Sequence, residues 1–257
     1  MSVWGIAMCK NEADIIGPIV AHMVGQVDHV LIADNLSTDE TPDILAASGA
    51  EVIVDDDPAY RQSEKMTALA QRARDGGATW VVPFDADEWW YSPHGRIADV
   101  LAGLSDSAIA TAAMYDHVPT LVDPIDDNPI TRIGWRRRDH GVFPKVACRT
   151  GDSLVVQQGN HGAVYNNGLT PNVIADQLVI RHYPYRTREQ FVAKAKQGAA
   201  ALRLTRLPRS SGLHWRQYAE IAERDGDEAL AAVFDNWFHS DDPAANPALI
   251  FDPAPQP

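Results

Sequence analysis

The sequence lacks an apolar run long enough to cross a bilayer. Its longest hydrophobic stretches have the length of a β-strand, whereas a membrane-spanning helix needs about 20 apolar residues in succession. The N-terminus also lacks the basic segment followed by an apolar one that marks a secretory signal. We therefore expect a cytoplasmic protein without a transmembrane segment.

Cysteine is scarce, and two glycine-rich motifs are missing. The only cysteines, Cys9 and Cys148, lie far apart without the spacing of a metal site, so we expect both to be reduced and structural. There is no Walker motif and no G-x-G-x-x-G segment, which argues against an ATPase or a dehydrogenase.

Basic residues are outnumbered. The chain has 22 Lys and Arg against 35 Asp and Glu, a formal charge of -13, so nucleic acid would meet a repulsive field over most of the surface. One local basic patch exists, at Arg136, Arg137 and Arg138. Three arginines are too few to indicate DNA binding, and a solvated turn or hairpin explains them better than a phosphate or acceptor contact.

The first hundred residues alternate short apolar runs with helix-like segments. Of the 257 residues 45% are hydrophobic, enough for a substantial core. Strands are predicted at residues 3–8, 29–33, 51–54 and 80–84, and helices at residues 13–24, 41–47 and 63–74, the last with Ser63 as its cap and Gly76 and Gly77 at its end. This alternation is typical of a parallel sheet built from β-α-β units.

The pattern changes after the fourth strand. Further strands are predicted at residues 108–115, 145–149, 153–157 and 177–182, with a long loop at 118–133, helices at 189–204, 215–223 and 228–238, and a tail over the last dozen residues. We expect a domain over residues 1–205, divided into two halves near residue 117, and a helical extension over residues 206–257.

Polar groups follow three of the early strands, where ligands gather in an open parallel sheet. The most informative group is Asp85, Asp87 and Glu88, directly after the fourth strand. Carboxylates this close repel one another unless something positive lies among them, and a divalent cation is the usual solution. Oxygen ligands suit Mg²⁺ or Mn²⁺, which commonly keep coordination positions for water and phosphate oxygens. A metal that also binds a diphosphate is therefore expected.

Three motifs together resemble the GT-A glycosyltransferases of the family 2 type. They are Ile6-Ala-Met-Cys-Lys-Asn-Glu12, Asp34-Asn-x-Ser-x-Asp-x-Thr41 and Phe84-Asp-Ala-Asp-Glu88. The sequence is most similar to the bacterial branch with a D-x-D-E motif and a later H-Y-x-x-R-[ST]-x-x-x-F-x-x-K pattern, which here runs from His182 to Lys194. Any one motif is weak, but three in this order at successive strand ends are fairly specific.

The resemblance implies an α/β GT-A fold, with a mostly parallel central sheet flanked by helices and a helical C-terminal tail. Within the domain it implies a donor-binding half to about residue 117 and an acceptor half from about residue 118. It also implies a set of donor-binding positions: Lys10, Asn11, Glu12, Asp34, Asn35, Asp85 and Ala86. By position, Asn11 and Glu12 would lie near the nucleobase or ribose, Asp34 near the nucleobase and Asp85 near the ribose. Three cations are further donor contacts or ordinary surface charge: Lys65, Arg186 and Lys194.

The same resemblance implies which residues bind the metal and which are catalytic. Asp87 would bind the Mn²⁺ or Mg²⁺, with His182 as the second protein ligand and His161 as the alternative. Transfer with inversion needs a group that removes the proton of the acceptor hydroxyl. Asp116 holds about the right place, but Tyr115-Asp-His-Val118 replaces the branch's aromatic-glycine element, so His161 and Glu88 remain candidates.

The predicted function is metal-dependent transfer of a sugar from a nucleotide-diphosphate sugar, with a UDP-sugar expected, to an acceptor that the sequence does not identify. Two alternatives stay open: a nucleotidyltransferase or phosphate hydrolase, and a non-catalytic module that binds a nucleotide sugar or glycan. Trp89, Trp90 and Tyr91 could stack on an acceptor sugar, although core packing explains them better.

Overall fold

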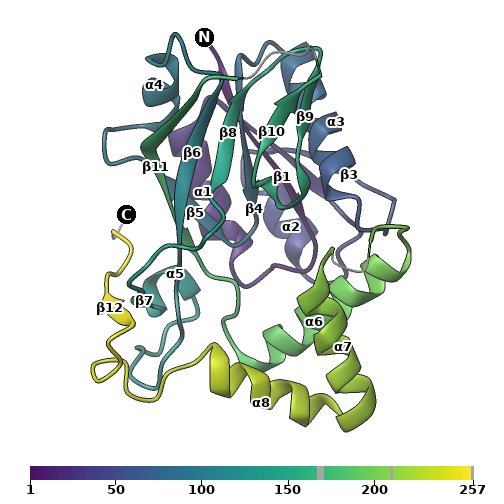
Figure 1. Ribbon diagram of the computed structural model, residues 1–257, viewed down its shortest axis with the longest axis vertical. Helices are drawn as coiled ribbons and strands as arrows, with labels where there is room; N and C mark the ends of the chain where they lie inside the picture. The colour runs from purple at the N-terminus through teal and green to yellow at the C-terminus, as the bar shows by residue number, and fades with distance from the viewer. Residues whose placement is uncertain (167–170, 209–210, 256–257) are drawn as a thin grey trace. The chain divides into compact units, whose positions relative to one another are not determined.

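The computed structural model describes residues 1–166, 171–208 and 211–255 (Figure 1). The chain forms two compact units. The first consists of residues 1–56, 62–115 and 140–182, and the second of residues 57–61, 116–139 and 183–257. The predicted division at residue 205 stays a prediction.

The first unit is built on an eight-stranded sheet of order β3-β2-β1-β4-β8-β6-β11-β5. Its strands are β1 (Val3–Cys9), β2 (His29–Asp34), β3 (Glu51–Val54), β4 (Trp80–Asp85), β5 (Glu88–Tyr91), β6 (Ile109–Asp116), β8 (Lys145–Arg149) and β11 (Val173–His182). Its other elements are α1 (Ile16–Gln26), α2 (Thr41–Ala46), α3 (Gln62–Asp75), α4 (Ile97–Ala102), the 3₁₀ turn η1 (Gln158–Asn160) and the hairpin of β9 (Leu154–Val156) and β10 (Ala163–Tyr165).

Strand register brings the polar strand ends to one edge of the sheet. β1 lies parallel to β2 and β4, with Cys9 opposite Asp34 and Met8 opposite Asp85. β5 runs antiparallel to β11, and Glu88 at its start lies opposite His182. The carboxyl ends of β1, β2, β4 and β11 therefore meet the start of β5 at this edge.

Apolar stripes on the helices explain how they cover the sheet. α1 buries Ile16, Ile19, Val20 and Met23, which recur at helical spacing. α3 buries Met66, Leu69, Ala70 and Ala73 in a core that includes Ile6 and Leu31 from the sheet. α3 lies against β1 and β9 (Figure 1), and its first residue, Gln62, accepts a hydrogen bond from Gly159 N in η1.

The second unit has a helical part and a small strand pair. Its elements are α5 (Pro129–Arg132), β7 (Trp135–Arg137), α6 (Arg188–Arg203), α7 (Leu213–Asp225), α8 (Asp227–Trp237) and β12 (Leu249–Phe251). α6 and α8 share a core of Phe191, Ala195, Leu230 and Phe234. β7 pairs antiparallel with β12.

The predicted α/β fold, with a central sheet flanked by helices, is confirmed, and several local predictions are wrong. The predicted tail contains β12, because Leu249 to Phe251 pair with β7; its last two residues, 256 and 257, lie outside the described part of the chain. Ser63 is not a cap, because α3 begins at Gln62 and the Ser63 hydroxyl donates to Val156 O at 2.6 Å. The predicted loop contains the short helix α5. Among the described residues, no helix is both long and apolar enough to span a membrane.

The arginine patch is used inside the second unit. Arg136 Nε donates to Asp252 Oδ2 at 2.6 Å, Arg137 Nη2 to Trp237 O at 3.2 Å, and Arg138 Nε to Pro247 O at 3.0 Å. The bonds of Arg136 and Arg138 attach this segment to the chain on either side of β12, and the bond of Arg137 attaches it to the end of α8. They support the structural interpretation of the patch over a phosphate contact.

Candidate active site

The loops after β1 and β2 are joined by hydrogen bonds at the edge of the sheet. Asn11 N donates to Ser37 Oγ at 2.9 Å, and its side-chain Oδ1 accepts from Thr38 N at 2.7 Å. Glu12 N donates to Thr41 Oγ1 at 2.9 Å. Asn11 also has a φ of 53°, a left-handed conformation that asparagine tolerates better than most residues. The structure thus brings the first two predicted motifs together.

A second cluster joins Asn35 and Lys65. Asn35 Nδ2 donates to Asp55 Oδ2 at 2.9 Å, and Lys65 Nζ pairs with the same oxygen at 2.6 Å. The side chains of Lys65 and Asp55 are only 13% and 15% exposed, so Lys65 is not an ordinary surface lysine. Beside this cluster, Asp34 is buried at the end of β2 and accepts from Ser37 N at 3.2 Å. Lys10 is half-buried after β1.

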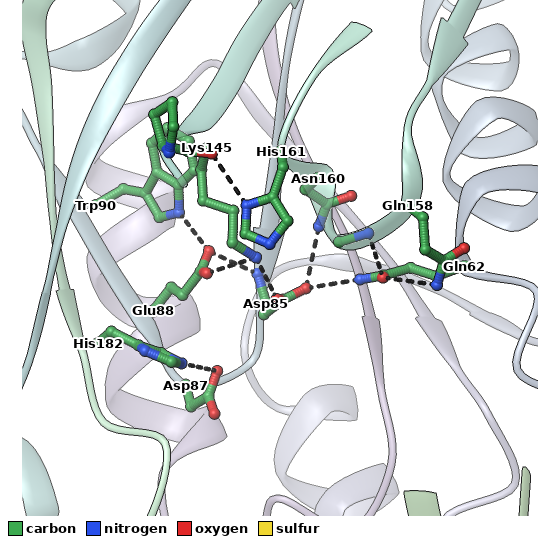
Figure 2. A network of polar contacts seen from close by, with 12 residues as sticks. Gln62, Asp85, Asp87, Glu88, Trp90, Lys145, Gln158, Asn160, His161 and His182 are labelled. Atoms are coloured by element: carbon green, nitrogen blue, oxygen red, sulfur yellow. Dashed lines mark hydrogen bonds and ion pairs between the residues drawn. The ribbon is translucent and has the colours of Figure 1, made fainter. Parts of the chain in front are cut away.

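The acidic motif surrounds a buried lysine that the sequence analysis missed. Lys145, at the start of β8, places its Nζ 2.5 Å from Asp85 Oδ2 and 2.9 Å from Glu88 Oε1 (Figure 2). Its side chain is 4% exposed. The repulsion between Asp85 and Glu88 is therefore relieved by an ammonium group of the protein itself, and this pair needs no metal ion for that purpose.

Glu88 has no solvent exposure, and both of its carboxylate oxygens have protein partners. Its Oε2 accepts from Asp85 N at 3.0 Å and from Trp90 Nε1 at 2.9 Å, while Oε1 faces Lys145. Burial raises the pKa of Glu88, and the Lys145 ammonium opposes this shift. Burial also lowers the pKa of Lys145, but the carboxylates of Asp85 and Glu88 outweigh it and raise that pKa above its ordinary value. Glu88 is thus a buried partner of Lys145.

Asp87 and His182 form the other half of the acidic site. His182 Nε2 lies 3.7 Å from Asp87 Oδ1, and Asp87 is buried while His182 is half-buried (Figure 2). Two ligand atoms at this separation can both bind one Mg²⁺ or Mn²⁺ at about 2.1 Å. Within the described residues no group of three or more His, Cys, Asp or Glu side chains could hold an ion. A metal at this pair would therefore take its other ligands from water or a bound phosphate.

Amide side chains from α3 and η1 complete the contacts of Asp85. Gln62 Nε2 and Asn160 Nδ2 both donate to Asp85 Oδ1, at 3.1 and 3.0 Å (Figure 2). Gln62 Oε1 in turn accepts from Gly159 N at 2.9 Å and from Gln158 Nε2 at 3.4 Å. With Lys145 on Oδ2, both oxygens of Asp85 are engaged.

His161 follows this turn and has one ring nitrogen engaged. Its Nδ1 lies 3.0 Å from Pro144 O, and its ring centroid is 5.7 Å from that of Phe143. Desolvation of the ring and the Lys145 ammonium lower the pKa of His161, while the Pro144 carbonyl and Asp85 oppose the shift. The imidazole is therefore neutral near pH 7.

The remaining predicted residues are distributed between the units. Ala86 is buried in the turn between Asp85 and Asp87, whereas Asp116, Arg186 and Lys194 belong to the second unit. The Arg186 side chain is buried, and its Nη1 donates to Tyr183 O at 2.9 Å. No donor or catalytic role of these residues follows from their contacts, so those roles stay predictions. The aromatic residues divide: Trp90 is fully buried, as the core interpretation requires, whereas the ring of Trp89 stacks on His22 at 3.8 Å.

The residues that the sequence analysis missed had weak signals. Lys145 starts the strand Lys-Val-Ala-Cys-Arg149, whose three middle residues are apolar, and a lysine there predicts an ion pair without indicating its partner. Gln62 and Asn160 contact Asp85 across 23 and 75 positions of sequence. Asn160 lies in the segment Gly159-Asn-His-Gly162, directly before the candidate residue His161, and this is the one signal that pointed to it.

The comparisons with known proteins identify the class. The sequence profile of the family described as Glycosyl transferase family 2 matches residues 6–158, more than half of the chain. The chain belongs to this family, and the predicted enzyme class, a glycosyltransferase, is confirmed. No curated protein matches the chain.

Solved structures show more distant similarity. Mannosyl-3-phosphoglycerate synthase from Rubrobacter xylanophilus is 22% identical over 44% of this chain and 40% of its own, with a TM-score of 0.36. S. aureus TarS 1–349 in complex with UDP is 13% identical over 92% of this chain and 75% of its own, with a TM-score of 0.42. Glucosyl-3-phosphoglycerate synthase from Mycobacterium tuberculosis, in complex with Mn²⁺, UDP and glucosyl-3-phosphoglycerate, is 21% identical over 44% of each chain, with a TM-score of 0.34. This chain covers less than half the length of either synthase.

Proposed function

We propose that the chain transfers a sugar from a UDP-sugar to an acceptor hydroxyl with inversion, and that it uses Mn²⁺ or Mg²⁺. The observation that carries this proposal is the 3.7 Å approach of Asp87 Oδ1 and His182 Nε2 at the edge of the sheet where the parallel strands end. Family membership supports the reaction class. A bound cation would neutralise charge on the departing diphosphate.

The other strand-end residues have complementary roles in this proposal. The loops of Asn11, Glu12 and Asp34 bind the nucleobase and ribose, with Asp85 on the ribose side. The cluster of Asn35, Asp55 and Lys65 orders the neighbouring loop, and we assign its partly buried lysine as a donor contact. Asp85 keeps lone-pair capacity beyond its protein contacts, because each carboxylate oxygen can accept more than one hydrogen bond.

His161 is the favoured proton acceptor of the reaction. Its ring is neutral near pH 7, and among the described residues its hydrogen bond is made by Nδ1, so Nε2 remains for an acceptor hydroxyl. Asp116 is the second candidate, at the end of β6. Turnover by His161→Gln and Asp116→Asn variants, compared over a pH range, separates the two: loss of the pH-dependent limb with only one variant identifies the group that titrates.

The first test is a thermal-shift and calorimetric screen against UDP, GDP and TDP and their sugars, with and without Mn²⁺. At about 100 times the dissociation constant, a ligand stabilises the fold by about 2.7 kcal/mol, so a preferred nucleotide is readily visible. We expect one uridine nucleotide to bind in a metal-dependent manner and both Asp87→Ala and His182→Ala to abolish that dependence.

The matched control is Asp152→Ala, which removes an exposed carboxylate that pairs with Arg74 in the same unit. This variant should bind nucleotide and metal as the wild type does. Nucleotide binding that is equally strong without Mn²⁺, or unaffected by Asp87→Ala, would overturn the metal assignment. If no nucleotide binds at all, the assignment of a nucleotide-sugar donor is wrong.

A further inference from the structure

His161 lies in a ring of contacts that begins and ends at Asp85 and passes through neighbouring residues of the chain. Asp85 Oδ2 pairs with Lys145 Nζ at 2.5 Å, and Lys145 directly follows Pro144, whose carbonyl oxygen meets His161 Nδ1 at 3.0 Å. On the other side, Asn160 precedes His161 and donates from Nδ2 to Asp85 Oδ1 at 3.0 Å. One carboxylate thus anchors the chain on both sides of the imidazole (Figure 2).

Asn160 is unusual in its backbone and in its burial. Its φ is 56°, in the left-handed region that asparagine visits more readily than other residues with a side chain, and it has no solvent exposure. Within the described part of the chain its Oδ1 has no hydrogen-bond partner, so the bond to Asp85 is the one its amide makes. Burying an amide is unfavourable unless it is hydrogen-bonded. The contact with Asp85 therefore explains why an amide occupies this position.

Gln62 of α3 also fixes the turn before His161. Gln62 donates to Asp85 Oδ1 at 3.1 Å, and its Oε1 accepts from Gly159 N at 2.9 Å. Gly159 has a φ of 74°, and a Cβ there would lie 2.5 Å from His161 Cδ2. The imidazole therefore lies directly over a glycine, which leaves little room for a different ring position.

This geometry selects one form of the imidazole. A backbone carbonyl can only accept, so His161 Nδ1 carries the proton, and Nε2 of the neutral ring is the unprotonated nitrogen. The charged or titratable groups that act on the ring are Lys145 and His182, which lower its pKa, and Asp85, which raises it. Nε2 is then the nitrogen that can take up a proton.

We propose that Asn160 is a positioning residue, which Asp85 anchors and which holds His161 in the Nδ1-protonated tautomer with Nε2 directed to the acceptor. This inference rests on the proposed function of His161. In the reaction, the hydroxyl oxygen of the acceptor forms a bond to the anomeric carbon and its proton goes to Nε2, while the bond from that carbon to the diphosphate oxygen breaks and the diphosphate leaves with the electron pair. The first aspartate of the acidic motif thereby orders the proton acceptor.

The experiment is ¹⁵N NMR of histidine-labelled protein without nucleotide or metal, in which protonated and unprotonated ring nitrogens give separate signals. The spectrum of His161→Gln assigns the His161 signals. Asn160→Gly keeps the left-handed backbone accessible and removes the amide. Asn160→Asp keeps the side-chain shape and places a carboxylate oxygen against Asp85. The matched control is Asn172→Gly, which removes an exposed amide that donates to Asp106 O.

We expect a single Nδ1-protonated form in the wild type and in Asn172→Gly, and a mixture of both tautomers in the two Asn160 variants. In a turnover assay the Asn160 variants should lose roughly 100-fold in kcat, as a displaced catalytic group does, with the donor KM little changed. An unchanged single tautomer in both folded Asn160 variants would overturn the proposal. The NMR result does not depend on nucleotide binding, so failure of the UDP-sugar assignment would be seen separately in the nucleotide screen.

Discussion

At the scale of single residues, the buried ammonium of Lys145 has the largest consequence. It lies between two carboxylates, one of which, on Glu88, is itself fully buried. Removing one partner from such a group leaves an uncompensated charge without water, which costs about 3–5 kcal/mol. Removing two opposite charges together avoids much of that penalty.

We therefore expect Lys145→Met to lower the free energy of unfolding by about 3–5 kcal/mol, and Lys145→Met combined with Glu88→Gln to recover part of the loss. Urea denaturation of the three proteins measures this. Lys196→Met is the control, because Lys196 is half-exposed where it pairs with Asp227, and such surface pairs contribute about 1 kcal/mol or less. If the double variant is no more stable than Lys145→Met, charge compensation is not the reason for the loss.

The predictability of the site residues differs for a physical reason. Asp85 and His182 end apolar strands and Asp87 follows one of them, and strand ends of a parallel sheet meet at one edge, so strand pattern together with the family resemblance was sufficient to predict that they lie together. Lys145 and Asn160 reach the same carboxylate from strands and turns that run antiparallel or leave the sheet. Nothing in their local sequence encodes that meeting.

At the scale of elements, the turn η1 combines two demands on one glycine. Gly159 has a left-handed φ of 74°, and a Cβ there would also collide with the His161 ring. Gly49 has a similar φ of 80°, but a Cβ there would meet nothing within 4 Å. Alanine substitutions at these two positions therefore distinguish the effect of backbone strain from the effect of displacing the imidazole.

We expect Gly49→Ala to destabilise the protein by about 1–2 kcal/mol, the usual penalty for a left-handed alanine, without an effect on turnover. Gly159→Ala should show this loss and also a fall in kcat of roughly 100-fold, because the ring must move. Unfolding curves and steady-state kinetics on both variants measure the two effects. Equal kinetics for the two variants would mean that the position of the His161 ring does not limit the reaction.

The elements themselves were predicted well where they are long and regular. The starts of α6, α7 and α8 lie within two residues of the predicted positions, because their apolar stripes recur with the helical period. β12 was missed because a strand of three residues is too short to show alternation, and because the prolines nearby resemble those of a tail. Its strand character comes from pairing with β7, a contact across more than 110 positions.

At the scale of the whole molecule, each unit has its own apolar core. In the first unit it includes Ile6, Leu31, Met66 and Val81. In the second, Phe191 is fully buried, with its ring centroid 4.8 Å from that of Tyr185 and 5.1 Å from that of Tyr218. Since a compact unit with a core of its own can unfold as a unit, damage to one core should stay local.

We expect Phe191→Ala to cost the second unit about 3–5 kcal/mol, the usual loss for deleting a buried phenylalanine ring. Hydrogen exchange measured by mass spectrometry should show faster exchange in peptides of α6, α7 and α8, whereas β1 and β4 keep their protection. Phe84→Ala in β4, which deletes a fully buried phenylalanine ring from the first unit, is the matched control and should give the reverse pattern. If both variants accelerate exchange in both units equally, the chain unfolds as one cooperative body, and the donor residues of the first unit depend on the helices of the second for their stability.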